Sequence, residues 1–411
     1  MQKFGLLGEH LTHSFSPFIH AELGDYEYLL FEKRPKEMEA FLLQGDFDGL
    51  NVTIPYKKAV IPFCKTLSET ALSAGSVNTI MRLPDGSLHG DNTDCYGFAR
   101  LLKKAGIDPA AGKTVVLGSG GSSLAVQAVL RDMNAKDIVI VSRNGKISYK
   151  DIEKYCDAAL LANTTPVGMY PNNGISPVSD LSIFKQCGAV IDLIYNPART
   201  ELLLQAEELG IPAFNGLAML VAQAKKAAEI FTGASIPDDT IEAIASKITR
   251  KTCNIVLIGM PGCGKTSIGE ALAKMTGRLF ADTDEWAAKA AGKPVPAIIA
   301  EDGEDKFRKL ETDALLELSK QSGLVIATGG GVVKRPANRS IMRQNGTMVF
   351  LDRELSKLPV VGRPLSERDG IAALAAERLP LYSQWSEHTV PVCGIEETAS
   401  KIREKLGLAG I

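Results

Sequence analysis

Short apolar runs alternate with longer amphipathic stretches along most of this 411-residue chain. The runs are rich in Val, Ile and Leu and are bounded by Gly, Pro, Asn and Asp, which is typical of strands in α/β proteins. In the first part, strands are predicted at residues 3–7, 26–32, 49–54, 77–83 and 87–91. The turn Pro84–Gly86 predicts that the last two form a hairpin. A second, almost wholly apolar series predicts a parallel sheet covered on both faces; its strands are 114–118, 137–142, 159–163, 189–195 and 212–215.

The α/β pattern then restarts. A helix is predicted over 219–232, and the Gly-, Pro- and Asp-containing segment 233–239 marks a boundary before an amphipathic stretch at 240–250. Further strands are predicted at 254–258, 278–282, 324–328 and 347–351, with two more helices around 387–392. The expected divisions are residues 1–95 with 217–233, residues 96–216, a linker at 234–252, and residues 253–411.

Bulk composition limits the classes of partner. Lys and Arg number 46 against 48 Asp and Glu, a formal charge of -2, so no basic surface for nucleic acid or an anionic membrane is expected. No apolar run is long enough to span a bilayer. The start of the chain lacks the apolar stretch of a signal peptide. The seven scattered cysteines form no CxxC pair and predict reduced thiols in a cytoplasmic protein.

The apolar run ending at Leu117 is followed by the glycine-rich turn Gly118–Ser123. Such a turn lets the backbone approach a pyrophosphate at a helix N-terminus, although glycine turns also occur without any ligand. The next strand ends in Arg143, with Lys146 nearby and no carboxylate for a ribose hydroxyl. This favours the 2′-phosphate of NADP, and the alternative is a solvated arginine at a loop tip.

Polar residues gather near the predicted strand ends of the first part. They are Ser14, Ser16, Asn51, Thr53, Lys57, Asn78 and Asp94. Asn51, Thr53 and Lys57 are expected at alternate positions of a strand end and so on one side. The set predicts a hydroxyl-binding pocket. Reduction of a ketone needs a proton at the carbonyl oxygen, and Lys57 held by Asp94 can donate it.

Seven motifs of this part occur in the order found in shikimate dehydrogenases: HSFSP, NVTIPYK, VNT, GDNTD, NTTPVGM, DLIYNP and QAKKAAEIFTG. The first ~233 residues therefore resemble that family. The resemblance implies an α/β substrate domain with a Rossmann-like NADP domain, and it makes Lys57 and Asp94 the catalytic pair. It places the substrate's hydroxyls and carboxylate on Ser14, Ser16, Thr53, Asn78, Tyr195 and Gln223. It places NADP(H) on Gly118, Gly120, Gly121, Ser122, Arg143, Gly216 and Met219.

Two points of this assignment stay open. Asn78 could instead cap a turn, and Tyr195 could belong to the core. The stretch between Arg143 and Asn163 is also shorter than the family pattern, which has room there for a helix, a strand and a loop. Residues 149–155 can make about two helical turns, so one edge strand is expected to be missing near the adenosine end of the cofactor.

The second half opens on a phosphate loop. Gly259–Thr266 fits GxxxxGK[ST] directly after the apolar run 254–258. Backbone amides from Gly262 to Thr266 would cradle phosphate, Lys265 would reach the β and γ oxygens, and Thr266 would bind Mg²⁺. The ATP-binding residues expected are Gly262, Cys263, Gly264, Lys265, Thr266 and Ser267. For the Cys263 side chain, the interpretation as a small loop filler is favoured over chemistry.

Further residues predict an acceptor that carries a carboxylate and hydroxyls. Asp282 and Asp284 follow a strand at alternate positions; one could serve the Mg²⁺ shell and the other an acceptor hydroxyl. Arg308 and Glu311 share one helical face. The remaining candidates are the amides of Gly329–Gly331, a lid at Gly362–Leu365, and Arg378. For the two arginines, the alternative is a surface ion pair.

The motifs GMPGCGKTSIG, DTD, FRKLE, ATGGG, GRPL and ERLPLY occur in the order found in shikimate kinases. Residues ~253–411 therefore resemble that family, which implies a P-loop fold of the nucleoside-monophosphate-kinase type. By this resemblance shikimate is held by Asp284, Arg308, Gly330 and Arg378. Asp284 orients the hydroxyl, Arg363 closes over the phosphates, and Asp282 with Thr266 serves the metal. The segment 355–361 is short, which leaves contacts from the lid to adenine open.

Shikimate is the metabolite that connects the two halves. The chain is predicted to reduce 3-dehydroshikimate with NADPH and to phosphorylate shikimate with MgATP, as a bifunctional cytoplasmic enzyme with small-molecule partners. One alternative is an inactive sensor or repressor, which predicts replacement of Lys57, Asp94, Lys265, Thr266 or Arg363. All five are present. The other alternative is a first half that prefers quinate or NAD.

Overall fold

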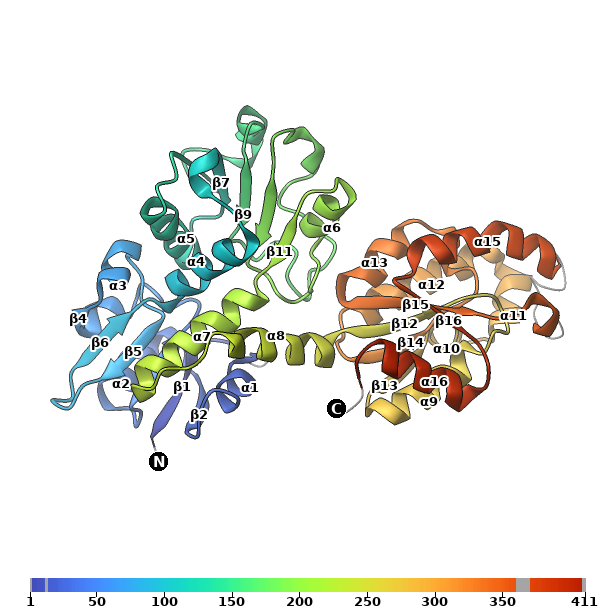
Figure 1. Ribbon diagram of the computed structural model, residues 1–411, viewed down its shortest axis with the longest axis horizontal. Coiled ribbons are helices and arrows are strands. Elements are labelled where there is room, and N and C mark those ends of the chain that lie inside the picture. The colour runs from blue at the N-terminus through green and yellow to red at the C-terminus, as the bar shows by residue number, and fades with distance from the viewer. Residues whose placement is uncertain (1, 12–13, 360–369, 409–411) are drawn as a thin grey trace. The chain divides into compact units, whose positions relative to one another are not determined.

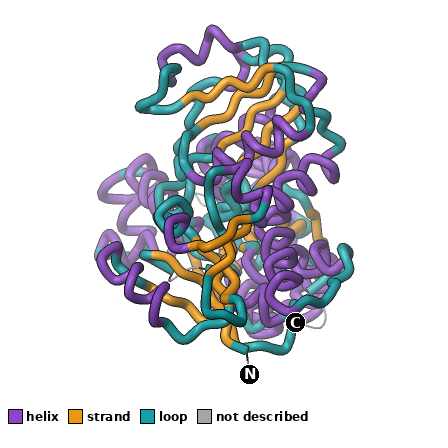
Figure 2. Tube along the Cα trace, turned by 90° about the vertical axis from the view of Figure 1, so that its left-hand side faces the viewer, coloured by secondary structure: helices purple, strands orange, loops and turns teal. Residues whose placement is uncertain are grey.

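The computed structural model describes residues 2–11, 14–359 and 370–408. The described residues form three sheets flanked by helices (Figures 1 and 2). The chain divides into two compact units: residues 1–169, 175–195 and 202–247 form one, and residues 170–174, 196–201 and 248–411 form the other. Both units are α/β, which confirms the predicted class.

The first sheet has the order β2-β1-β3-β5-β6-β4. Its strands are β1 Lys3–Gly8, β2 Glu27–Glu32, β3 Gly49–Val52, β4 Cys64–Leu67, β5 Thr79–Arg82 and β6 Leu88–Asp91. β5 pairs antiparallel with β3 and β6, while the other neighbours are parallel. The predicted hairpin is therefore confirmed. β4 was not predicted, because none of its residues is fully buried and its sequence, CKTL, has no apolar run.

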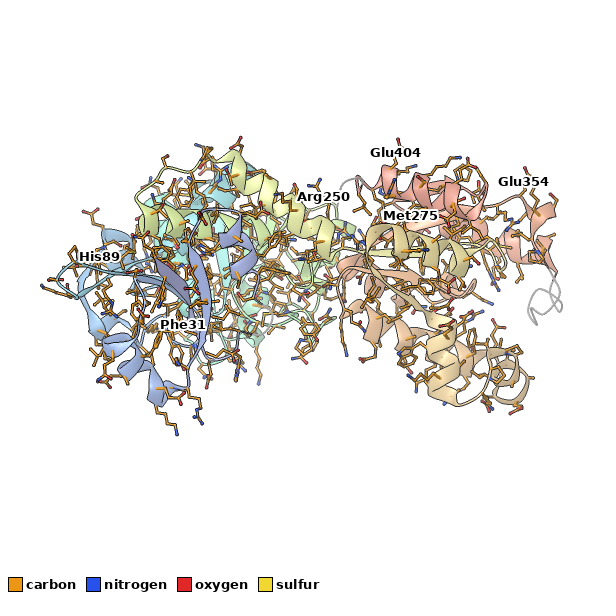
Figure 3. The ribbon with its side chains drawn as sticks, turned by 90° about the horizontal axis from the view of Figure 1, so that it is seen from below. Phe31, His89, Arg250, Met275, Glu354 and Glu404 are labelled. Carbon is orange, nitrogen blue, oxygen red and sulfur yellow. The ribbon has the colours of Figure 1, made fainter. Side chains whose placement is uncertain are left out.

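Helices cover this sheet. They are α1 Ser16–Ala21, α2 Pro35–Gln44, η1 Ile61–Phe63, α3 Glu69–Ala74, α4 Thr93–Ala105 and α7 Leu217–Thr232. Phe31 of β2, labelled in Figure 3, packs on Phe41 of α2 with ring centroids 4.8 Å apart. α4 and α7 pack closely at Gly97, where a Cβ would lie 2.8 Å from the carbonyl oxygen of Met219. A larger residue there would push the two helices apart.

The second sheet is parallel throughout, with the order β11-β10-β9-β7-β8. Its strands are β7 Lys113–Leu117, β8 Asp137–Val141, β9 Leu160–Asn163, β10 Ala189–Asp192 and β11 Ala213–Asn215. Its helices are α5 Gly121–Asp132, α6 Glu201–Glu208, η2 Pro109–Ala111, η3 Tyr149–Tyr155 and η4 Leu181–Ile183. Every residue of β9 and β10 is buried, as the apolar runs predicted. Only the 3₁₀ segment η3 lies between β8 and β9 in the described chain, so β8 ends the sheet as the short spacing predicted.

The third sheet, also parallel, has the order β13-β14-β12-β15-β16. Its strands are β12 Asn254–Ile258, β13 Leu279–Asp282, β14 Leu324–Ala327, β15 Gly346–Asp352 and β16 His388–Pro391. Its helices and turns are α9 Lys265–Thr276, α10 Thr283–Ala291, α11 Val295–Ala297, η5 Ile298–Asp302, α12 Glu304–Ser319, η6 Val332–Lys334, α13 Ala337–Asn345, η7 Leu355–Lys357, α15 Ile371–Trp385 and α16 Ile395–Lys405. The two predicted C-terminal helices are present. The strand between them, β16, was not predicted, because only Val390 in it is buried.

The segment expected as a linker contains the helix α8, Asp239–Thr252. Just before this helix, the Asp238 carboxylate accepts hydrogen bonds from Tyr96, Arg100 and Lys225 of the first unit. Residues up to 247 belong to the first unit, and the last turn, which includes Arg250 (Figure 3), belongs to the second. Every helix in the described part of the chain is too short or too polar to cross a bilayer.

Two candidate active sites

The first site is built around an ion pair. Lys57 Nζ lies 2.6 Å from Asp94 Oδ2, and the two side chains are 13% and 9% exposed. Asp94 is in the first turn of α4, where a carboxylate is favoured by the helix dipole. Its other oxygen accepts a hydrogen bond of 3.0 Å from Asn78 Nδ2. Asp94 is thus fixed on both oxygens and holds the ammonium group in one place.

The local backbone that places Lys57 differs from the predicted strand. β3 ends at Val52, and Lys57 lies in the turn that follows, so strand alternation cannot align it with Asn51. The turn is held instead by a hydrogen bond from the backbone amide of Val77 to the carbonyl of Lys57, 2.8 Å. The expectation that Asn51, Thr53 and Lys57 share one strand face is therefore wrong for Lys57.

The predicted substrate residues fall into groups in the first unit. Asn78 joins Asp94 to Gln223, whose Oε1 lies 3.5 Å from Asn78 Nδ2. The backbone amide of Ser16 donates to Ser14 Oγ at 3.2 Å, which ties these two serines together. Tyr195 lies against Phe15, with ring centroids 5.7 Å apart, and burial raises its pKa. Thr53 follows β3 directly, and a Cβ on Gly8 would lie 2.7 Å from its methyl group.

The glycine turn after β7 opens toward Lys57. Gly118 has φ of 109°, which favours glycine, and a Cβ there would lie 2.6 Å from Thr164 Oγ1. Gly121 is the first residue of the 12-residue helix α5, and a Cβ on it would lie 3.3 Å from the Lys57 side chain. The space beside Gly120, the N-cap, is open to 4 Å. This cradle at a helix N-terminus fits a cofactor diphosphate next to Lys57.

The remaining predicted cofactor residues lie on this sheet and on α7. Arg143 is exposed two residues after β8, which neighbours β7. Ser122 is partly exposed in the first turn of α5. Gly216 caps α7 against the backbone of Leu193, and Met219 is buried in the first turn of α7. Sequence reasoning missed Ser123, whose hydroxyl donates to the carbonyl of Gly118 at 2.7 Å and closes the turn.

The second site begins at the phosphate loop after β12. Gly259, Gly262 and Gly264 have φ of 148°, 79° and 104°, so the loop needs glycine at each. Lys265 starts α9 and donates to the carbonyls of Gly259 and Met260 at 2.8 and 3.0 Å. The loop therefore curls around its own lysine, as a phosphate cradle requires.

Two other predictions on this loop concern Cys263 and the metal. Cys263 is fully buried, as the filler interpretation predicted, with its Sγ 3.1 Å from where a Cβ on Gly259 would stand. Thr266 Oγ1 donates to Asp282 Oδ2 at 2.8 Å, so the two predicted Mg²⁺ residues lie together. They offer two oxygen ligands, and Mg²⁺ in nucleotide sites completes its shell with phosphate and water. The neighbouring Ser267 is exposed.

The expectation that Asp282 and Asp284 share one strand face is wrong. β13 ends at Asp282, which caps α10 by accepting a hydrogen bond of 2.8 Å from the amide of Asp284. Asp284 therefore lies in the first turn of a helix. Burial, together with the nearby charges of Glu311 and Asp282, raises the pKa of Asp284 to about 7.

Buried charges surround the glycines after β14. Arg308 and Glu311 are both buried and pair at 2.9 Å, as their spacing predicted. Asp284 Oδ1 and Glu311 Oε1 are buried oxygens that have no hydrogen-bond partner among the described residues, and both face the position that a Cβ on Gly329 would take. A Cβ on Gly331 would meet the Arg308 guanidinium. The glycines thus let three charged side chains converge on one loop.

Arg378 of α15 completes this cluster. It is 1% exposed, and its Nη1 donates to the carbonyl of Gly330 at 3.3 Å. Its Nη2 is buried and has no partner in the part of the chain that the structure describes. Sequence reasoning missed Tyr382, whose hydroxyl donates to the same carbonyl. The helical spacing of four residues from Arg378 was the available signal. Arg363 and the predicted lid Gly362–Leu365 lie outside the described residues.

The fold and the two sites define an α/β dehydrogenase joined in one chain to a P-loop kinase. The sequence matches the shikimate dehydrogenase substrate binding domain over residues 6–80 and shikimate kinase over residues 261–406. A shikimate dehydrogenase (NADP(+)) of Clostridium perfringens is 37% identical over 270 residues, which cover 60% of this chain and 98% of that protein. A shikimate dehydrogenase (NADP(+)) of Methanopyrus kandleri is 38% identical over 265 residues, which cover 57% of this chain and 91% of that protein.

Solved structures agree. Shikimate dehydrogenase 1 from Peptoclostridium difficile is 35% identical, covers 60% of this chain and 98% of its own, and has a TM-score of 0.56. A chorismate mutase/shikimate 5-dehydrogenase fusion protein from Clostridium acetobutylicum is 37% identical and has a TM-score of 0.57. The match covers 60% of this chain and 97% of that one. The chain belongs to the shikimate dehydrogenase family, and it carries a shikimate kinase domain in its second half. Both resemblances found in the motifs are confirmed.

Proposed function

We propose that this chain catalyses two consecutive reactions, the reduction of 3-dehydroshikimate to shikimate with NADPH and the phosphorylation of shikimate with MgATP. The observation that carries the first is the buried Lys57–Asp94 pair, 2.6 Å apart, beside the N-terminus of α5. In a solved relative from Thermus thermophilus, 30% identical with a TM-score of 0.55, the corresponding fold is in complex with NADP(H) and shikimate.

In the first reaction, the chain's own residues bind the substrate and supply a proton. NADPH supplies the hydride. Lys57 donates a proton to the carbonyl oxygen as the alkoxide forms, and Asp94 stabilises the ammonium form and its orientation. Hydroxyls and carboxylate are held by Ser14, Ser16, Thr53, Asn78, Tyr195 and Gln223. The cofactor lies on Gly118, Gly120, Gly121, Ser122, Gly216 and Met219, with Arg143 at the 2′-phosphate.

In the second reaction, positioning and charge supply most of the catalysis. ATP supplies the phosphoryl group. Lys265 and the loop amides stabilise its charge, and Asp282 and Thr266 hold Mg²⁺. Asp284 accepts a hydrogen bond from the hydroxyl of shikimate and so orients it. The guanidinium of Arg378 is buried and, among the described residues, only partly paired, so it fits the carboxylate of that substrate together with Arg308 and the amide of Gly330.

We also assign the two reactions to separate parts of the chain. We assign reduction to residues 1–95 and 217–233 with the cofactor domain 96–216, and phosphorylation to 253–411. We place the enzyme in the cytoplasm, since its seven cysteines are all unpaired.

A coupled assay tests the proposal. The chain is given 3-dehydroshikimate, NADPH and MgATP, while NADPH loss and shikimate 3-phosphate are both followed. We expect one phosphorylated product per NADPH oxidised, and without ATP we expect shikimate to accumulate. NADPH loss without phosphorylated product would contradict the kinase assignment. Phosphorylation of added shikimate without NADPH oxidation would contradict the dehydrogenase assignment.

A further inference from the structure

A ladder of side-chain hydrogen bonds runs along one side of α5 and ends on the glycine turn of the cofactor site. The hydroxyl of Ser123 donates to the carbonyl oxygen of Gly118 at 2.7 Å. The Ser123 oxygen in turn accepts a hydrogen bond of 3.0 Å from Gln127 Nε2. Gln127 Oε1 accepts one of 3.1 Å from Arg131 Nη2, at the exposed end of the ladder. Ser123 is fully buried and Gln127 is 9% exposed, so water competes little for the bonds they make.

The turn held by this ladder has a backbone that is intrinsically flexible. Of the four residues Gly118–Gly121, three are glycines, and glycine loses the most conformational freedom when it is fixed. Where the turn leaves the sheet, the amide of Gly118 donates to the carbonyl of Val141 at 2.8 Å. Where it enters α5, the amide of Leu124 donates to the carbonyl of Gly120 at 3.2 Å. The peptide group between these two points needs an anchor of its own.

Ser123 provides the anchor for this peptide group, which joins Gly118 to Ser119. The Ser123 hydroxyl is its only hydrogen-bond partner among the described residues. The group is trans, so its amide hydrogen points opposite to its carbonyl oxygen. Because the carbonyl points at the buried Ser123, the amide of Ser119 points away from it, on a turn whose residues Ser119 and Gly120 are exposed. An unbonded backbone amide beside a helix N-terminus is a donor suited to a diphosphate.

We propose that Ser123 is a positioning residue of the dehydrogenase, which fixes the cofactor turn through the carbonyl of Gly118 and so holds the Ser119 amide toward the cofactor diphosphate; this rests on the proposed function of that site. Gln127 supports the arrangement. Ser123 has a single proton, and a donor at its oxygen leaves that proton for Gly118. The Gln127 amide therefore determines the direction in which the Ser123 hydroxyl donates.

The expected effect is on the part that the two nicotinamide cofactors share. NADPH and NADH have the same diphosphate and differ at the ribose 2′-position. Loss of the Ser123 hydroxyl therefore weakens both cofactors by the same factor, whereas a change at Arg143 is expected to affect NADPH alone. Lys57 is held by Asp94 and by the amide of Val77, outside this turn. The rate at saturating cofactor and the binding of shikimate are therefore expected to be kept.

The first test compares Ser123→Ala with Thr114→Val in the full chain. Thr114, on β7, is the matched control, because its hydroxyl is also fully buried but has no hydrogen-bond partner among the described residues. The dissociation constants of NADPH and NADH are measured by titration of nicotinamide fluorescence. The KM for shikimate and the kcat are measured in NADP⁺ reduction. For Ser123→Ala we expect both dissociation constants to rise about tenfold, with the KM for shikimate and the kcat within twofold.

For Thr114→Val we expect all four quantities within twofold of the unmutated chain. Unchanged cofactor affinity in Ser123→Ala contradicts the proposal. So does a loss confined to NADPH, or a loss of shikimate affinity as large as the loss of cofactor affinity. An unmutated chain that binds neither cofactor contradicts the proposed function of the site, and this role with it.

A second variant, Gln127→Glu, tests the direction of the bond while Ser123 stays in place. A carboxylate at this position pairs with Arg131 and only accepts, so it takes the Ser123 proton away from Gly118. We expect the dissociation constant of NADPH to rise about fivefold in the unmutated chain and less than twofold in a Ser123→Ala background. Equal factors in the two backgrounds would show that the new charge acts on the cofactor without Ser123, and would overturn the proposal.

Discussion

At the scale of single residues, the geometry separates a proton donor from a neighbouring lysine of the same charge. Lys57 is largely buried against Asp94, whereas Lys58 is exposed on the same turn. Lys57→Ala removes the group that protonates the carbonyl oxygen, so we expect reduction of 3-dehydroshikimate to fall by ~10²–10⁴-fold. Steady-state NADPH oxidation measures this, with phosphorylation unchanged. Lys58→Ala should leave both activities intact, and near-full reduction by Lys57→Ala would show that the donor is another group.

Arg143 is the residue expected to distinguish the two nicotinamide cofactors. It is exposed after β8, next to the strand that leads into the glycine turn. Arg143→Ala should raise the KM for NADPH roughly tenfold or more while leaving the KM for NADH nearly unchanged, because charge-assisted hydrogen bonds to the 2′-phosphate are worth ~1.5–3 kcal/mol each. Lys136, exposed just before the other end of β8, provides the control Lys136→Ala. Equal use of both cofactors by the unmutated enzyme would contradict this role.

At the scale of elements, the turn after β14 shows why a loop can need glycine without an unusual backbone angle. A Cβ on Gly329 would meet carboxylate oxygens of Glu311 and Asp284, and Glu311 is held by its ion pair with the buried Arg308. Overpacking of this kind costs ~1–3 kcal/mol. We expect Gly329→Ala to lower the Tm of the kinase unit and to reduce phosphorylation at least tenfold, with reduction of 3-dehydroshikimate unaffected. Gly394→Ala is the control, since a Cβ there meets nothing within 4 Å. An active Gly329→Ala kinase would mean that the carboxylates can move aside.

Elements with a strong pattern were predictable, and those held by tertiary contacts were not. The apolar runs of β9, β10 and β12 predicted these buried strands without any further information. β16 was missed because only one of its residues is buried, and it forms only by pairing with β15. Strand periodicity also failed beyond strand ends, where Lys57 is placed by a turn and Asp284 by a helix cap. Motifs singled out these residues as site candidates, but their geometry depended on bonds between distant segments.

The Gly, Pro and Asp residues at 233–239 were likewise an incomplete guide to the structure of the segment 234–252. Gly, Pro and Asp before residue 240 predicted a linker, and the stretch beyond it does read as an amphipathic helix. The structure adds what local sequence could not show, namely that Asp238 binds partners on α4 and α7, more than a hundred residues away for α4. Lys225, one of these partners, is buried and also pairs with Glu229 at 2.8 Å. Side chains of the segment are thus part of the first unit's packing.

At the scale of the whole molecule, the two sites use separate sets of residues, and no residue proposed for one serves the other. Lys57→Ala should therefore retain phosphorylation of added shikimate. Lys265→Ala should retain reduction but lose nearly all phosphorylation, since Lys265 neutralises charge on the transferred phosphoryl group. When the two variants are mixed with 3-dehydroshikimate, NADPH and MgATP, shikimate made by the Lys265→Ala chains can be phosphorylated by the Lys57→Ala chains.

The mixture also separates diffusion from direct transfer of the intermediate. If shikimate is released to solution between the steps, the mixed variants should form shikimate 3-phosphate after a lag, and adding unlabelled shikimate should dilute label from 3-dehydroshikimate in proportion to its concentration. The unmutated chain should then show the same lag and the same dilution, because each of its sites draws on one common pool. A product whose label is not diluted in the unmutated chain, but is diluted in the mixture, would show that shikimate passes between sites of one molecule without leaving it. We expect dilution in both, since the residues proposed for each site all come from one half of the chain.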